Sequence, residues 1–172
     1  MLTLDSNSFP MLTTARLTLK PLELSDVNAI FALRSNDEVN QFIGRKKAET
    51  LQDAHDFILK IQQNGTDKTS FYWGIQAQNV TELIGTICFW NLERDKGIAE
   101  IGYELMPHYQ GKGLMQEALT VVIDYAFFIG FTTITAYPHA ENAPSIRLLE
   151  RNHFKKQGIL DAYNALIYTL SK

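Results

Sequence analysis

The chain has 172 residues, of which 45% are hydrophobic and 11% aromatic, enough for one domain with a buried core. Its formal net charge is −3, from 16 basic and 19 acidic side chains. That balance argues against a nucleic-acid-binding protein, because phosphate contacts need a clustered basic surface. A single cysteine, Cys88, excludes a disulfide framework within the chain.

No signal peptide is recognisable, and no stretch approaches the roughly 18 apolar residues of a membrane span. We therefore expect a cytoplasmic protein that binds neither a membrane nor nucleic acid. No linker composition and no internal repeat is present, so we expect one domain over residues 12–172 behind a short leader at residues 1–11.

In chain order, the sequence first predicts a strand at 16–20 and a helix whose N-cap is Ser25. A second helix is predicted from Leu51 to a C-cap at Gly65. Its predicted buried face consists of Leu51, Ala54, Ile58 and Ile61. A hairpin of strands at 71–77 and 83–90 follows, with its turn near Gln78 and Asn79. Next come a strand at 97–106, a helix at 113–126, a strand at 131–137, a short helix at 144–152, and strands at 154–159 and 165–170. This order predicts an α/β protein with a mixed sheet of the α+β kind, not a regular βαβ repeat.

The most informative segment is the junction at 109–113, where a predicted strand leads into Tyr-Gln-Gly-Lys-Gly and a helix follows at once. Glycines let backbone N–H groups converge, and a helix N-terminus adds unpaired donors and partial positive charge. Together these features favour a phosphate or pyrophosphate site. The alternative is a plain turn from strand to helix. Two other phosphate loops do not fit, because no Ser or Thr follows Gly111-Lys112 and no third glycine follows Gly113.

Gln110-x-x-Gly113-x-Met115 resembles the Gln/Arg-x-x-Gly-x-Gly/Ala signature of the GNAT superfamily of N-acetyltransferases, with Met115 in place of the small final residue. Three further blocks, at 12–21, 99–103 and 141–154, resemble its ribosomal-protein N-acetyltransferase branch. The resemblance covers roughly Leu12 to Gly158. It implies a GNAT-like acyl-CoA N-acyltransferase fold, acetyl-CoA as donor, an amine as acceptor, and no metal.

The resemblance also implies which residues hold acetyl-CoA. The loop would bind the pyrophosphate, a backbone N–H near Leu105 or Met106 would polarise the thioester carbonyl, and Asn142 would contact the pantetheine arm. The expected cofactor-binding residues are Leu105, Met106, Gln110, Gly111, Lys112, Gly113, Leu114, Met115, Asn142 and Ser145.

Two carboxylates are the candidates for a general base. Side chains alternate along a strand, so Glu100 and Glu104 point to the same face of the strand that leads into the loop. The resemblance favours Glu100 as the base, with Glu104 second; alternatively, either is a solvated or ion-paired carboxylate. Ser145 is the family's candidate proton donor to the leaving thiolate, whereas Asn142 also suits a helix N-cap.

Other residues are assigned to structure. Cys88 lies in an apolar strand with no basic residue nearby in sequence, and we expect a buried core cysteine. The aromatic residues at 71–73 and 89–90 either fill the core or face a substrate. A catalytically silent acyl-CoA-binding domain and a module for another nucleotide are the competing functions. The acceptor is not specified, and a homodimer is possible.

Overall fold

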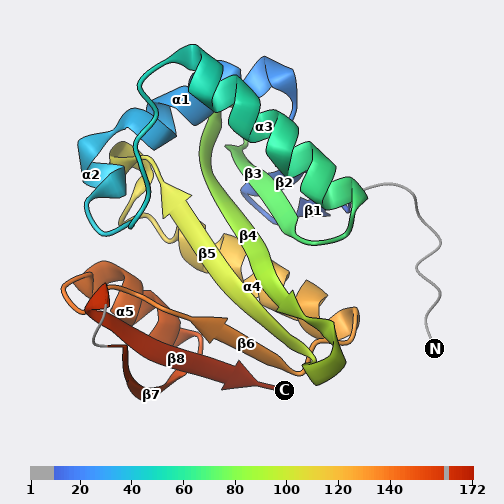
Figure 1. Ribbon diagram of the computed structural model, residues 1–172, viewed down its shortest axis with the longest axis vertical. Coiled ribbons are helices and arrows are strands. Elements are labelled where there is room, and N and C mark those ends of the chain that lie inside the picture. Colours follow the sequence, from blue (N-terminus) through green and yellow to red (C-terminus); the bar gives the residue numbers. More distant parts are fainter. Residues whose placement is uncertain (1–9, 161–162) are drawn as a thin grey trace.

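The computed structural model describes the backbone of residues 10–160 and 163–172. These residues form one eight-stranded mixed sheet with helices on both faces (Figure 1). The strands are β1 (Leu12–Thr13), β2 (Leu17–Pro21), β3 (Phe71–Ala77), β4 (Leu83–Glu93), β5 (Ile98–Leu105), β6 (Thr133–Ala136), β7 (Lys155–Leu160) and β8 (Ala165–Ser171). Their order across the sheet is β1-β2-β3-β4-β5-β6-β8-β7.

The α-helices of this part of the chain are α1 (Val27–Ser35), α2 (Asp37–Asn40), α3 (Leu51–Thr66), α4 (Leu114–Phe128) and α5 (Ala143–Arg151). Short 3-10 turns are η1 (Leu24–Asp26), η2 (Arg94–Lys96) and η3 (Pro107–Tyr109). The fold confirms the predicted mixed α/β class and a single domain. The proposed leader falls mostly on residues 1–9, which lie outside the described residues, and it stays a prediction.

The sheet opens between β5 and β6. These strands form the one parallel pair among the described strands, and their pairing runs only from Ile98 with Thr133 to Glu100 with Thr135. Beyond Glu100 the two strands diverge (Figure 1). Because β5 keeps only β4 as a neighbour there, the edge of β5 that faces β6 has backbone groups available to a ligand.

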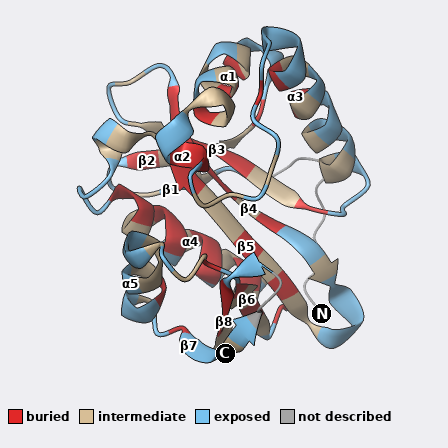
Figure 2. Ribbon diagram, turned by 60° about the vertical axis from the view of Figure 1, so that its left-hand side comes forward, coloured by how far each residue is buried: buried red, intermediate tan, exposed pale blue. Residues whose placement is uncertain are grey.

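Two apolar clusters hold the helices on opposite faces. Helix α4 buries seven side chains, including Leu119 and Val122, against one face of the sheet (Figure 2). On the opposite face, α1 and α3 pack Ile30, Leu33 and Ile58 over β2 to β4. This division leaves the second face of β5 uncovered by α4, and that face contains the candidate site.

The predicted helix end at Gly65 is wrong. Gly65 lies inside the last turn of α3, and Asp67 is the C-cap. The helix closes later because Lys68 takes the left-handed conformation (φ 56°) and its N–H donates to the Gly65 carbonyl at 3.1 Å. Leu51, predicted on the buried face, is 49% exposed because it lies in the first turn, whereas Ala54 and Ile58 reach the core.

Candidate active site

The loop between β5 and α4 has the geometry of an anion site. Gly111 and Gly113 have φ values of 72° and 74°, where a side chain would be strained. No backbone N–H from Gly111 to Gln116 donates a hydrogen bond to a described residue. These free donors lie at the N-terminus of the 15-residue helix α4, whose dipole adds partial positive charge. The loop therefore fits a pyrophosphate.

Arg16 ties this loop to the start of the sheet. Its Nη1 donates to the Lys112 carbonyl at 3.0 Å, and its Nε donates to Glu117 Oε2 at 2.7 Å. Burial raises the pKa of Glu117, but hydrogen bonds from Thr14 and Arg16 outweigh it and hold that pKa below its usual value. The turn between β1 and β2 thus braces the loop, a role that the local sequence around Arg16 does not reveal.

The other predicted loop residues divide between backbone and side-chain roles. Leu114 and Met115 bury their side chains in the core, so Met115 leaves the space outside the loop free. Lys112 is exposed. The Gln110 side chain donates to the Leu105 carbonyl at 2.9 Å and fixes the turn that leads out of β5.

The backbone of β5 distinguishes the two predicted carbonyl-binding groups. The Met106 N–H donates to the Ile84 carbonyl of β4 at 2.9 Å. Successive N–H groups along a strand point to opposite sides, so the Leu105 N–H points away from β4, toward the opening beside β6. Leu105 is thus the residue whose N–H is directed at the opening.

A cavity of about 590 Å³ lies on the face of β4 and β5 that α4 leaves uncovered. Its floor consists of cross-strand pairs: Thr86 with Glu104, Cys88 with Gly102, and Trp90 with Glu100. A second cavity of about 670 Å³ adjoins it. Both are lined by Phe42, Ile43, Gly44, Trp90, Glu100, Tyr137 and His139.

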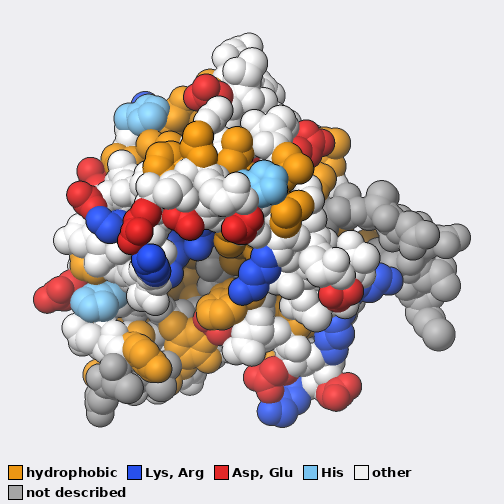
Figure 3. All heavy atoms as spheres, turned by 45° about the horizontal axis from the view of Figure 1, so that its top comes forward, with side chains coloured by type: hydrophobic (Ala, Val, Ile, Leu, Met, Phe, Trp, Pro, Cys, Tyr) orange, Lys and Arg blue, Asp and Glu red, His pale blue; other side chains and the backbone are white. Residues whose placement is uncertain are grey.

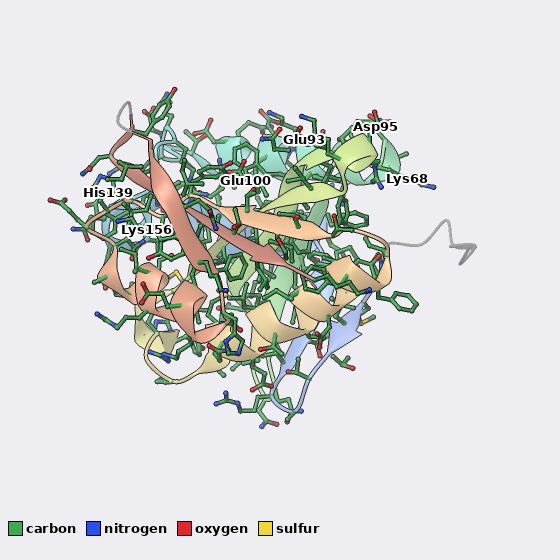
Figure 4. The ribbon with its side chains drawn as sticks, turned by 90° about the horizontal axis from the view of Figure 1, so that it is seen from below. Lys68, Glu93, Asp95, Glu100, His139 and Lys156 are labelled. Carbon is green, nitrogen blue, oxygen red and sulfur yellow. The ribbon has the colours of Figure 1, made fainter. Side chains whose placement is uncertain are left out.

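Glu100 lies where the two cavities meet. Its carboxylate is half-buried and accepts one hydrogen bond, from Asn91 Nδ2 at 3.2 Å. Burial raises the pKa of Glu100, and the Asn91 hydrogen bond offsets part of that rise. Figure 4 shows Glu100 between His139 on one side and Glu93 and Asp95 on the other.

Glu104 shares the face of Glu100 but has a different environment. Its side chain is 5% exposed and forms an ion pair with Arg45, with 2.5 Å between Oε2 and Nη2. Thr86 Oγ1 donates to its other oxygen at 3.2 Å, and Arg45 Nε donates to Asn40 Oδ1 at 2.7 Å. Both carboxylate oxygens of Glu104 therefore have protein partners, whereas only Oε2 of Glu100 has one, from Asn91.

Ser145 and Asn142 enter the cavity from α5. Asn142 caps the helix, with its Oδ1 accepting from the Ser145 N–H at 3.2 Å, and it also lines the cavity. The Ser145 hydroxyl is 2.8 Å from the Tyr103 hydroxyl, so the pair bridges α5 and β5 across the opening. Burial raises the pKa of Tyr103 to about 12, which keeps it a neutral phenol. Sequence reasoning missed Tyr103 because its partner is 42 residues away.

The position of Cys88 corrects one expectation, and the aromatic residues divide between the two predicted alternatives. Cys88 is only partly buried and lines the cavity, because alternation along β4 turns it to the Gly102 face. Burial raises the pKa of its thiol to about 12, so a reactive thiolate is disfavoured. Trp73 and Phe89 fill the core, whereas Tyr72 and Trp90 line the cavity.

Two findings concern other kinds of site. Among the described residues no cluster of three or more His, Cys, Asp or Glu side chains is arranged to hold a metal ion. No helix in the described ranges is long and apolar enough to cross a membrane.

Comparison with known proteins places this geometry in a family. The family description "Acetyltransferase (GNAT) domain" matches residues 16–155. The chain is 37% identical to the uncharacterized N-acetyltransferase YoaA of Bacillus subtilis over 156 residues, 90% of this chain and 88% of that protein.

Solved structures share the fold. A putative ribosomal-protein-serine acetyltransferase from Vibrio cholerae has a TM-score of 0.82 at 21% identity, covering 94% of this chain and 97% of its own. The microcin C7 self immunity acetyltransferase MccE, solved with acetyl-CoA and AMP, has a TM-score of 0.80 at 20% identity, covering 92% and 94%.

The chain belongs to the GNAT family of acetyltransferases. It is an N-acetyltransferase, and acetyl-CoA is its acyl donor. The resemblance read from the sequence is confirmed, including the likeness to ribosomal-protein acetyltransferases among the structural neighbours.

Proposed function

We propose that this N-acetyltransferase moves the acetyl group of acetyl-CoA to a primary amine by direct attack of the amine on the thioester. The acceptor is a protein N-terminal α-amine or a small-molecule amine. One observation carries the proposal. Glu100 is a half-buried carboxylate at the junction of two cavities, on the strand β5 that leads into the proposed pyrophosphate loop. A domain that only bound acetyl-CoA would have no use for such a group.

Glu100 acts as the general base, directly or through one water. The amine nitrogen must lose a proton to attack, and a carboxylate whose pKa is raised by burial is a stronger proton acceptor than an exposed one. Removing this proton is easier from an α-amine, whose pKa is near 8, than from a lysine amine, whose pKa is near 10.4. An α-amine is therefore the easier acceptor for a carboxylate base such as Glu100.

Leu105 and Ser145 would act on the carbonyl oxygen and on the sulfur of the thioester, respectively. The Leu105 N–H would donate to the carbonyl oxygen as negative charge develops on it during attack. When the C–S bond breaks, the Ser145 hydroxyl would give its proton to the sulfur, and the Tyr103 hydroxyl, 2.8 Å away, would orient it. The loop from Gln110 to Met115 and Asn142 would hold the rest of the donor.

The likeness to ribosomal-protein acetyltransferases favours a peptide α-amine over other amines. Both cavities together offer room for several residues of an acceptor next to Glu100. A cytoplasmic location and a homodimer stay predictions from the sequence.

Turnover of acetyl-CoA, measured as free thiol released against a panel of amines, tests the proposal. The panel contains peptides with N-terminal Ala, Ser and Met, together with polyamines, aminoglycosides and amino acids. Thiol release with one acceptor class supports the proposal and identifies that class. Tight binding of acetyl-CoA without release from any acceptor would favour the catalytically silent domain.

A further inference from the structure

The first cavity is electrically polarised. Three basic side chains line it from α1, from the segment after α2 and from α3: Arg34, Arg45 and Lys60. Two carboxylates line it, and one of these, Glu104, is already paired with Arg45. Two positive charges therefore remain at the helical end, while Glu100 is the carboxylate at the other end. Figure 3 shows basic side chains around a hollow in this face, with acidic side chains next to them.

Arg34 is the informative member of this set. Its guanidinium carbon lies 3.8 Å from the centre of the Phe57 ring, a cation–π contact with the cavity wall. Among the described residues it has neither a hydrogen bond nor an ion pair through its side chain. Burial and then repulsion from Arg45 lower its pKa, although the group stays charged. A half-buried cation with five free donors is the natural partner of an anion.

Lys60 adds a second free charge at the rim. It is exposed on α3, lines the same cavity, and forms no ion pair with a described residue. Arg45 is already engaged by Glu104 and Asn40. The charge open to a ligand thus comes from Arg34 and Lys60.

We propose that the acceptor is an amine that also carries a carboxylate, which Arg34 and Lys60 bind while the amine lies at Glu100. This inference rests on the proposed function and names the acceptor class of that same site. Opposite charges at the two ends of one cavity fix the direction in which the acceptor enters.

The separation of the two ends sets the length of the acceptor. The Phe57 ring beneath Arg34 packs edge-on against Tyr72, with 5.5 Å between the ring centroids. The Tyr72 hydroxyl lies 3.2 Å from that of Thr86, which donates to Glu104, so Arg34 lies at the Glu104 end of β5. Glu104 is four residues from Glu100, which is about 13 Å along an extended strand. After the reach of the side chains is subtracted, amine and carboxylate must lie on the order of 10 Å apart, or about three extended residues. A free α-amino acid is too short, so the geometry points to a peptide N-terminus with a carboxylate near its third residue.

Matched tripeptides test this inference. Ala-Ala-Asp-amide, Ala-Ala-Asn-amide and Ala-Ala-Lys-amide differ at one side chain, and Ala-Ala-Asn with a free C-terminus supplies the carboxylate from the backbone. The measurement is kcat/KM for thiol release by the full chain. We expect the Asp peptide to exceed the Asn peptide about tenfold or more, since a charge-assisted hydrogen bond is worth that much. Comparing the Asp peptide with the Ala-Ala-Asn peptide that has a free C-terminus shows whether a side-chain or a C-terminal carboxylate is preferred.

Variants locate the effect. Arg34→Gln and Lys60→Gln should each reduce the ratio of Asp to Asn peptide toward one, with Arg34→Lys in between. Lys60 is exposed, so its variant tests the inference even where Arg34→Gln fails to fold, as judged by circular dichroism. Arg151→Gln, exposed at the end of α5 and outside both cavities, is the charge-matched control and should keep the ratio.

The outcomes separate the two proposals. Turnover with equal kcat/KM for the Asp and Asn peptides, or a preference for the Lys peptide, would overturn this inference and leave the proposed function standing. A preference for Asp that survives both Arg34→Gln and Lys60→Gln would also overturn it. No thiol release with any peptide or amine would refute the proposed function and the inference together.

Discussion

Removing Arg45 separates a structural role of Glu104 from a catalytic one. The Arg45→Met variant leaves the carboxylate of Glu104, 5% exposed, with only the Thr86 hydrogen bond. Breaking a buried ion pair by removing one partner costs about 3–5 kcal/mol. Because the Arg45 side chain is 18% exposed and water reaches it, we expect the lower end, about 3 kcal/mol. For a chain of this size that corresponds to a fall in Tm of roughly 6–12 °C.

Thermal and urea unfolding followed by circular dichroism measure this effect. The double variant Arg45→Met/Glu104→Gln is the control, since it removes the buried charge together with its partner. We expect the double variant to be more stable than Arg45→Met alone. A loss below about 0.5 kcal/mol in Arg45→Met, within the range of ordinary surface changes, would refute the ion pair. So would a double variant whose loss equals the sum of the two single variants.

Three further predictions concern the chemistry. Glu100→Gln should lower kcat by about 10²–10⁴-fold and remove the acid limb of the pH–rate profile. In the wild type this limb should lie above the ordinary glutamate pKa, because burial raises the pKa of Glu100. An unchanged pH–rate profile would remove Glu100 from the mechanism. Gly113→Val should weaken acetyl-CoA binding, measured by calorimetry. The control Gly130→Val also replaces a glycine with positive φ, and it should lower stability without changing the affinity for acetyl-CoA. Equal acetyl-CoA affinities of the two variants would contradict the loop assignment. Ser145→Ala should lower kcat with the dissociation constant of acetyl-CoA unchanged, and a wild-type kcat would exclude it as proton donor.

Much of the fold could be predicted from local patterns. The change from period two to helical spacing marked β5, the loop and α4, and the glycines at 111 and 113 marked the turn between them. Strand β1 and helix α2 were missed because two and four residues are too few to show a period. Thr50 and Asp53 form a capping box at the start of α3, a signal that the sequence contained.

The site could be predicted only in part, because its remaining members meet through long-range contacts. Arg45 reaches Glu104 across 59 residues, and Tyr103 reaches Ser145 across 42. The alternation of side chains predicted that both glutamates share one face of β5, but no local pattern indicates that Arg45 forms an ion pair with Glu104. The position of Cys88 on the cavity wall likewise depended on the register between β4 and β5.

The short parallel contact between β5 and β6 has a consequence for rigidity. Only three residue pairs join these strands, and α4 spans the junction on one face. Acetyl-CoA bound between β5 and α5 would link the two halves of the sheet, because it would contact the loop, β5 and Asn142 at the same time. Hydrogen exchange in β6 and β8 should therefore slow when acetyl-CoA is added, and the protein should melt at a higher temperature in proportion to the logarithm of ligand concentration.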